Sequence, residues 1–229
     1  MFGTNPSRKQ VLDDGQELWV QEVFYTLQGE GPFSGQPALF IRLAGCNLRC
    51  FWCDTEFESS TWRPGLFDLL SRVEQLRPAC CDLVVLTGGE PFRQNIAPLV
   101  RALLHRGLRV QIETSGTLWV ELPEDDRITI VCSPKSPRLD ARLERRISAY
   151  KYVLAAGEVD ADGLPMRSTQ VRNRVARIAR PRPGAAVFVM PRDDRDPGAN
   201  TANLAVCIDA SKQHGYRLTL QLHKLAGLP

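Results

Sequence analysis

The chain has 229 residues, 43% of them hydrophobic, and a formal net charge of +3. A nearly balanced charge argues against broad binding to nucleic acid or to a membrane surface, and a chain of this length can bury a sizeable core without disulfides. No stretch is apolar enough to span a bilayer or to act as a signal peptide, and an odd number of cysteines, seven, suits a reducing compartment. The sequence therefore predicts a single cytoplasmic domain over residues 1–229.

Hydrophobic runs and helical periodicities predict the elements along the chain. Strands are expected at residues 18–25, 38–43, 83–86, 110–113, 128–132, 150–154, 186–190 and 218–222. Helices are expected at residues 66–76, 95–106 and 203–214, with Cys207 on the apolar stripe of the last. The alternation of strands and helices from Leu83 onward is typical of parallel βαβ units, and six or so parallel strands with few helices favour an α/β partial TIM-type barrel with a mainly parallel sheet. Such barrels place their chemistry at the carboxyl ends of the strands.

Three cysteines follow the second predicted strand with the spacing CxxxCxxC: Cys46, Cys50 and Cys53. Three thiolates can hold a [4Fe–4S] cluster that leaves one iron without a protein ligand, and this iron can chelate the amino and carboxylate groups of a small molecule. The alternative is a zinc site completed by a more distant cysteine, namely Cys80, Cys81 or Cys132.

A glycine-rich turn, Thr87-Gly88-Gly89-Glu90-Pro91, follows the apolar run at residues 83–86. Two successive glycines let backbone carbonyls approach a bound ammonium group, Glu90 adds a negative charge, and Pro91 ends the strand. The turn and the cysteine loop, with Trp52 before the last cysteine, together resemble the radical S-adenosylmethionine (SAM) enzymes. The resemblance implies that the cluster binds SAM and that the turn receives its amino group.

Several further segments narrow the resemblance: Tyr25-Thr-Leu-Gln-Gly-Glu-Gly31, Arg42, Asp54-Thr55, Glu113-Thr-Ser-Gly116, Ser133-Pro-Lys135 and the C-terminal residues 221–229. Together they are similar to the 7-carboxy-7-deazaguanine synthase family of queuosine and 7-deazapurine biosynthesis. Membership implies a lyase that converts 6-carboxy-5,6,7,8-tetrahydropterin to 7-carboxy-7-deazaguanine with loss of ammonia.

Two other functions are open from the sequence. One is a radical SAM activase that generates a glycyl radical on a partner enzyme. The other is a zinc-stabilised adaptor that binds RNA through the arginine-rich residues 167–182, although this stretch lacks aromatic residues for base stacking and is better explained as a solvated helix face.

The resemblance assigns site residues position by position. It implies SAM contacts from Trp52, Cys53, Asp54, Gly88, Gly89, Glu90, Ser115, Gly116, Ser133, Pro134, Lys135, Met190, Pro191, Arg192 and Asp193, with only the backbone of Met190 expected to take part. It implies contacts with the pterin substrate from Leu27, Gln28, Gly29, Glu30, Arg42 and Thr114. Thr55 is expected to bind Mg²⁺ together with substrate and water.

The end of the chain adds two more expected substrate contacts. A strand at residues 218–222 would deliver His223 to the active-site face. The short tail could then fold back, so that the terminal carboxylate of Pro229 pairs with the N–H groups of the pterin. The expected partners are flavodoxin or ferredoxin as electron donor and a second copy in a homodimer, with no direct contact with nucleic acid or membrane.

Overall fold

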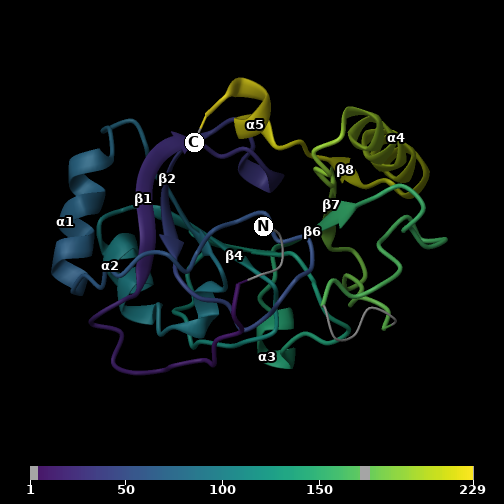
Figure 1. The fold of residues 1–229 in the computed structure, drawn as a ribbon. Helices are drawn as coiled ribbons and strands as arrows, with labels where there is room; N and C mark the ends of the chain where they lie inside the picture. The colour runs from purple at the N-terminus through teal and green to yellow at the C-terminus, as the bar shows by residue number, and fades with distance from the viewer. Residues whose placement is uncertain (1–4, 171–175, 229) are drawn as a thin grey trace.

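The computed structural model describes residues 5–170 and 176–228, and its centre is one eight-stranded sheet (Figure 1). The strands follow chain order across the sheet: β1 (Val20–Leu27), β2 (Pro37–Leu43), β3 (Leu83–Gly88), β4 (Arg109–Thr114), β5 (Ile128–Cys132), β6 (Ala149–Leu154), β7 (Ala186–Pro191) and β8 (Arg217–Leu218). β1 is antiparallel to β2, and every later neighbour is parallel. The sheet runs open from β1 to β8, which confirms the predicted α/β partial barrel.

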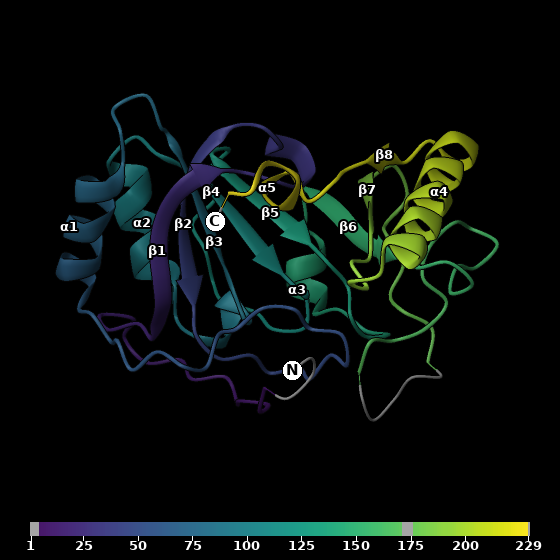
Figure 2. The same cartoon turned by 45° about the horizontal axis from the view of Figure 1, so that its top comes forward.

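Helices cover the two ends and one face of this sheet (Figure 2). They are α1 (Leu66–Leu76), α2 (Ala97–His105), α3 (Ala141–Glu144), α4 (Pro197–His214) and α5 (Leu222–Ala226), with short 3₁₀ turns η1 (Gly31–Phe33) and η2 (Pro91–Arg93). α1 packs on β1 and α2, whereas α4 packs on β7. None of the helices in the described part of the chain is long and apolar enough to cross a membrane.

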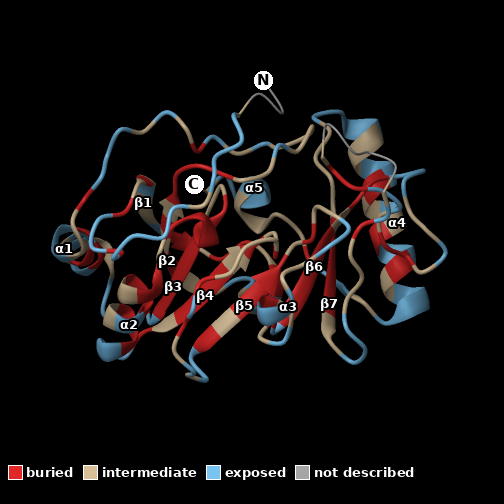
Figure 3. Ribbon diagram, turned by 90° about the horizontal axis from the view of Figure 1, so that it is seen from below, coloured by how far each residue is buried: buried red, intermediate tan, exposed pale blue. Residues whose placement is uncertain are grey.

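The core lies along the central strands, which are buried over most of their length (Figure 3). Leu83, Val84, Val85 and Leu86 of β3 are all fully buried. A parallel strand that is covered on both faces is expected to be continuously apolar, which explains why this run carried a clear sequence signal. Cys207 is buried on α4, as its place on the apolar stripe predicted.

Three predicted elements differ from the structure. The helix expected at residues 203–214 begins at Pro197, where the Asp196 side chain accepts the N–H of Ala199 and caps the helix. The strand expected at residues 218–222 is only Arg217–Leu218, because the chain leaves the sheet after Thr219 and Leu222 begins α5. The helix expected in residues 167–182 is absent from the described part of that stretch, of which 171–175 lie outside the described residues. There, Arg177 and Arg180 form ion pairs with Asp160 and Asp162 and hold two loops together.

The register of the parallel strands brings the sequence motifs to one edge of the sheet. Arg42 at the end of β2 is opposite Thr87, which begins the glycine-rich turn of β3. In the same way, Thr114 of β4 is opposite Cys132 of β5. Because the carboxyl ends of parallel strands point in one direction, segments far apart in the sequence share this edge.

A buried asparagine on α4 fixes the two loops at the far side of this edge. Asn203 is 2% exposed, and its Oδ1 accepts the N–H of Ala156 at 2.8 Å. Its Nδ2 donates to the carbonyl oxygen of Arg192 at 2.8 Å and to the carboxylate of Asp194 at 2.9 Å. One side chain therefore fastens the turns after β6 and β7 to the helix behind them.

Asn203→Leu should destabilise the fold, since a leucine of similar size removes the hydrogen bonds to the N–H of Ala156, the carbonyl of Arg192 and the carboxylate of Asp194. We expect a loss of about 3 kcal/mol in the free energy of unfolding, measured by urea denaturation. Thr201→Val on the exposed face of the same helix is the control and should change the free energy by less than about 0.5 kcal/mol. Equal stability of the two variants would contradict the role assigned to Asn203.

Candidate active site

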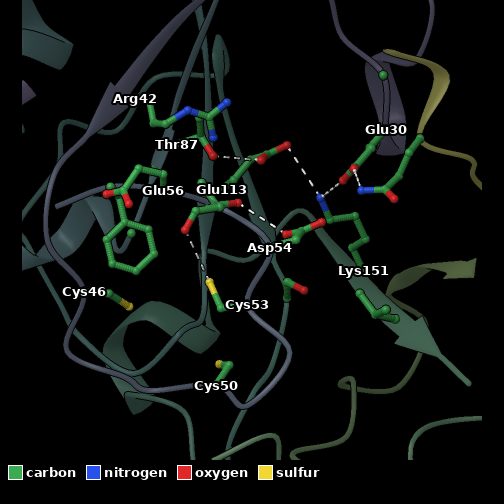
Figure 4. Close-up of a pocket in the computed structure, with 18 of the residues that line it drawn as sticks. Glu30, Arg42, Cys46, Cys50, Cys53, Asp54, Glu56, Thr87, Glu113 and Lys151 are labelled. Atoms are coloured by element: carbon green, nitrogen blue, oxygen red, sulfur yellow. Dashed lines mark hydrogen bonds and ion pairs between the residues drawn. The ribbon is translucent and has the colours of Figure 1, made fainter. Parts of the chain in front are cut away.

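The carboxyl edge of the sheet surrounds a cavity of about 650 Å³ (Figure 4). Its lining includes the three cysteines, the two glycines of the turn after β3, and side chains from β1, β2, β4, β6 and β7. A cavity of this size can hold a ligand of several hundred daltons, and its convergent charged groups mark it as the candidate active site.

One end of the cavity is formed by the cysteine loop. Cys46, Cys50 and Cys53 are free thiols in the structure, and all three line the cavity. The Sγ of Cys46 accepts the backbone N–H of Leu48 at 3.4 Å, and the Sγ of Cys50 accepts the hydroxyl of Thr169 at 3.1 Å. Hydrogen-bond donors aimed at sulfur suit thiolates that hold an iron–sulfur cluster, so the residues present fit this group.

The thiols themselves are hard to ionise without a metal. Burial raises the pKa of Cys46 and of Cys53 above the usual value. Within the described ranges, no three His, Cys, Asp or Glu side chains converge on a single-ion site. Of the cysteines considered for a zinc site, Cys80 is exposed, while Cys81 and Cys132 are buried in the sheet region.

The glycine-rich turn after β3 packs directly on the start of the cysteine loop. The N–H groups of Gly89 and Glu90 donate to the carbonyl oxygens of Leu43 and Gly45 at 3.1 and 3.0 Å. A Cβ on Gly88 would lie 2.0 Å from the oxygen of Leu43, and one on Gly89 would lie 2.2 Å from the oxygen of Gly45. Only glycine permits this contact, which places the turn beside the cysteines.

Glu90 lies beneath the turn and does not line the cavity. It is fully buried, and its carboxylate accepts hydrogen bonds from Phe92 N, Thr114 Oγ1, Ser115 N and Ser115 Oγ at 2.6 to 3.1 Å. Burial raises the pKa of Glu90, although the four donors favour the ionised form. Its hydrogen bonds connect the turn with the end of β4. This position beneath the turn does not support the expected direct contact between the Glu90 carboxylate and SAM.

A pair of side chains covers the wall next to the cysteines. The ammonium of Lys135 lies 5.4 Å from the ring centre of Trp52 and donates to the carbonyl oxygen of Ser133. Burial lowers the pKa of Lys135. This arrangement gives the wall an aromatic face with a cation over it.

The opposite end of the cavity carries a buried ionic network centred on Lys151 of β6. Its ammonium donates to the carboxylate of Glu30 and lies 3.7 Å from Glu113 Oε1. Burial alone would lower the pKa of Lys151, but the two carboxylates raise it well above the usual value. Burial likewise opposes ionisation of Glu30, yet Lys151 holds its pKa below the usual range. Both partners are therefore charged at neutral pH.

Polar side chains complete this network around Glu113. Its carboxylate accepts hydrogen bonds from Thr87 Oγ1 at 3.1 Å, Gln111 Nε2 at 3.0 Å and Gln28 Nε2 at 3.2 Å. In the sequence, Glu113 stands at the end of a predicted strand and opens the segment Glu113-Thr-Ser-Gly116, with no contact assigned to it, and Lys151 is not among the predicted site residues. The available signal was a lysine in the middle of an apolar parallel strand, which requires a buried partner.

The C-terminal segment closes the cavity from above. The N–H of Leu222 donates to the oxygen of Gly29 at 3.2 Å, and Gln221 Nε2 donates to Glu30 at 3.2 Å. A Cβ on Gly29 would lie 2.5 Å from His223 Nδ1, so this glycine makes room for the imidazole. Burial lowers the pKa of His223, which favours the neutral ring at pH 7.

Lys224 of α5 anchors that closing segment to two other loops. Its ammonium lies 3.2 Å from Asp54 after the cysteine loop and 2.8 Å from Asp193 after β7. Lys224 holds the pKa of Asp193 well below its usual range. Thr55 follows Asp54, and its hydroxyl lies 3.4 Å from Asp54 Oδ1, so two oxygen-bearing side chains meet at this point of the cavity.

Arg42 of β2 stands near Thr87 in the wall of the cavity (Figure 4). Its Nε donates to Glu22 at 2.6 Å, and the guanidinium lies 5.5 Å from the ring centre of Phe24. The ion pair with Glu22 engages Nε of Arg42. A bidentate hydrogen-bonded pair with a ligand carboxylate would also use a terminal nitrogen of the guanidinium.

Most residues expected from the sequence meet in this cavity. The exceptions are Glu90, Gly116 and Pro134, which do not line it, and Pro229, which lies outside the described residues. The following polar lining residues have no ligand contact predicted from the sequence, although all but Lys151 lie in motifs or segments quoted there: Thr87, Glu113, Lys151, Gln221 and Lys224.

Comparison with known proteins identifies close relatives of this chain. Residues 40–145 match the radical SAM superfamily. A 7-carboxy-7-deazaguanine synthase of Rhodospirillum rubrum is 60% identical over 231 residues, covering 98% of both chains, and one of Rickettsia prowazekii is 39% identical over 238 residues, covering 100% of this chain and 96% of the relative. The fold also matches the crystal structure of QueE from Escherichia coli, with a TM-score of 0.68 and 24% identity over 91% of this chain and 97% of that one.

Gly89→Ala should disrupt the turn, because the added methyl group meets the backbone oxygen of Gly45, which cannot swing away as a side chain can. We expect a loss of roughly 3 kcal/mol of stability in thermal unfolding. The control is Gly65→Ala, where a Cβ meets nothing closer than 3.9 Å and the expected loss is at most about 1 kcal/mol. Unchanged stability in Gly89→Ala would show that the turn is not constrained in this way.

Proposed function

Because the chain belongs to the 7-carboxy-7-deazaguanine synthases, a family of radical SAM enzymes, we propose that it converts 6-carboxy-5,6,7,8-tetrahydropterin to 7-carboxy-7-deazaguanine with loss of ammonia. The observation that carries the proposal is one cavity with two chemically different ends. Three thiols and a glycine turn stand at one end, and a buried ionic network stands at the other. The match to these synthases favours this reaction over a radical SAM activase or a zinc-stabilised adaptor.

At the sulfur end, Cys46, Cys50 and Cys53 would hold a [4Fe–4S] cluster. When the cluster and SAM are bound, they supply a 5′-deoxyadenosyl radical that can abstract hydrogen from the substrate. The protein's task is to orient the two small molecules and to exclude water and other hydrogen donors. The carbonyl groups of the Gly88-Gly89 turn would receive the SAM amino group, with Glu90 acting from beneath as the brace of that turn.

At the charged end, the pterin substrate would meet a set of paired donors and acceptors. Arg42 suits the substrate carboxylate, while Gln28 and Glu30 suit the amide and amino edge of the ring. Lys151 keeps Glu30 ionised and so keeps it an acceptor. His223, neutral and packed on Gly29, would close the site over the ring.

Magnesium would bind at Thr55. A hydroxyl beside the carboxylate of Asp54 offers the oxygen ligands that Mg²⁺ prefers, and this ion commonly leaves several positions to water and substrate. We propose that the substrate completes the coordination there, which would join the sulfur end of the cavity to the pterin.

Two partners complete the proposal. A low-potential one-electron carrier, flavodoxin or ferredoxin, would reduce the cluster, and a second copy of the chain would form a homodimer. The lining of the cavity comes from this chain alone, so the proposed reaction does not depend on either partner assignment.

The direct test is an anaerobic assay of the iron-loaded protein with 6-carboxytetrahydropterin, SAM, Mg²⁺ and dithionite, followed by mass spectrometry of the product. We expect 7-carboxy-7-deazaguanine, and SAM cleavage should be lost in Cys50→Ala because a methyl group cannot ligate iron. Cys80→Ala changes an exposed thiol outside the cavity and should retain full activity. A brown, SAM-cleaving protein that leaves the pterin unchanged would refute the substrate.

Thr55→Ala should lower turnover while leaving the visible spectrum of the cluster intact, because it removes an oxygen ligand of Mg²⁺ without touching a sulfur ligand. The measurement is activity as a function of Mg²⁺ concentration after treatment with a chelator. We expect the variant to need at least about tenfold more Mg²⁺ for half-maximal activity. If wild-type activity is the same with and without Mg²⁺ after chelation, the site at Thr55 is wrong.

A further inference from the structure

We propose that Thr169 and Gln170 tune the reduction potential of the cluster by donating hydrogen bonds to the sulfur of Cys50. The inference rests on the proposed cluster and adds two residues that lie outside its motif, 119 and 120 positions beyond Cys50. Thr169 Oγ1 is 3.1 Å from Cys50 Sγ, and Gln170 Nε2 is 3.3 Å from the same atom.

The segment that carries these donors is attached to the cysteine loop by its backbone. Gln170 and Cys50 form an antiparallel bridge, and the N–H of Phe51 donates to the oxygen of Thr169 at 3.1 Å. Thr169 is only 7% exposed. The backbone contacts therefore hold the segment against the cysteine loop, with both donors at the sulfur of Cys50.

The orientation of the Gln170 amide follows from its second bond. Its Oε1 accepts the N–H of Arg49 at 3.0 Å, and a backbone N–H can only donate. The opposite end of the amide, which faces Cys50, must then be the NH₂ group. An amide nitrogen has no acceptor capacity, so its contact with the sulfur is a donated hydrogen bond.

The hydroxyl of Thr169 has two acceptors within reach, Cys50 Sγ and the oxygen of Lys135 at 3.3 Å. The Lys135 oxygen already accepts the N–H of Thr169 at 3.2 Å and the hydroxyl of Ser168 at 3.0 Å, which occupies both of its lone pairs. A thiolate is also the stronger acceptor because it is charged. The hydroxyl proton is therefore directed to the sulfur.

The surroundings of the other two sulfurs differ. Among the described residues, Cys46 Sγ accepts the backbone N–H of Leu48, and Cys53 Sγ lies 3.9 Å from the carbonyl oxygen of Thr55, which is an acceptor. The side-chain donors of Thr169 and Gln170 thus act on one corner of the proposed cluster.

Donors at a ligand sulfur favour the reduced cluster. Adding one electron places more negative charge on the iron and its thiolates, and a hydrogen bond stabilises that charge more in the reduced form than in the oxidised form. Burial strengthens the effect because little water is present to compete. Thr169 and Gln170 should therefore make the potential less negative and ease reduction by a one-electron donor.

The experiment is a redox titration of the iron-loaded protein without SAM or substrate, with dithionite and mediators, followed by electron paramagnetic resonance of the reduced cluster. In Thr169→Val and in Gln170→Met, the ratio of reduced to oxidised cluster at a fixed potential should fall about threefold each. Thr169→Ser keeps the hydroxyl and should keep the wild-type potential. Thr201→Val on α4 is the matched control and should also be unchanged.

Full iron content with an unmoved potential in Thr169→Val and Gln170→Met would overturn the inference. So would an equal shift in Thr169→Ser and Thr169→Val, since packing would then be the cause. If Thr169→Val fails to retain iron, Gln170→Met decides, and loss of iron from both would assign the segment to cluster retention and reject tuning. A wild-type protein that takes up no cluster would refute the proposed function itself.

Discussion

The ammonium of Lys151 is the charge on which the arrangement of the cavity depends. Burying the charged ammonium of a lysine in the interior of a parallel strand is costly unless carboxylates pair with it, so the fold must place carboxylates beside it. Glu30, from the turn after β1, and Glu113, from the end of β4, supply them across the open side of the sheet. Gln221 of the C-terminal segment then bonds to Glu30. The N-terminal hairpin, the central sheet and the end of the chain therefore meet at one ionic network.

The network lies at one end of the cavity and the three thiols lie at the other, so the two ends suit different chemistry. The sulfur end needs donors aimed at thiolates and a backbone that can approach a ligand closely, and the turn at Gly88 and Gly89 provides that approach. The charged end needs fixed acceptors for an uncharged heterocycle, and an ionised Glu30 remains an acceptor because Lys151 holds its pKa down. Lys224 fastens the closing C-terminal segment over the cavity by ion pairs with Asp54 and Asp193. Orientation of two molecules by rigid walls is the contribution that a protein can make to radical chemistry.

Local signals in the sequence predicted those parts of the fold that local physics determines. The buried run of β3 and the apolar stripe of α1 were placed within two residues of their bounds, and both cavity motifs were recognised from short spacings. The predicted C-terminal strand is too long because the chain turns away from the sheet after Thr219, whose N–H still bonds to Val189 of β7 and whose hydroxyl accepts the N–H of Gly31, 188 residues away. The arginines near residue 180 were assigned to a helix because their acidic partners, such as Asp162, lie in another loop. Tertiary contacts overrode the local pattern in each case.

The same division explains which site residues a motif can contain. Ligands of one cluster must reach irons a few ångströms apart, so a short loop with fixed spacing supplies them and the spacing becomes visible in the sequence. A hydrogen bond to a ligand sulfur carries no such constraint, because any segment that packs against the loop can provide the donor. Thr169 and Gln170 are of this kind, and so is Lys151 toward Glu30. The cluster loop therefore indicates the reaction class, whereas the potential and the substrate depend on residues that only the folded chain brings together.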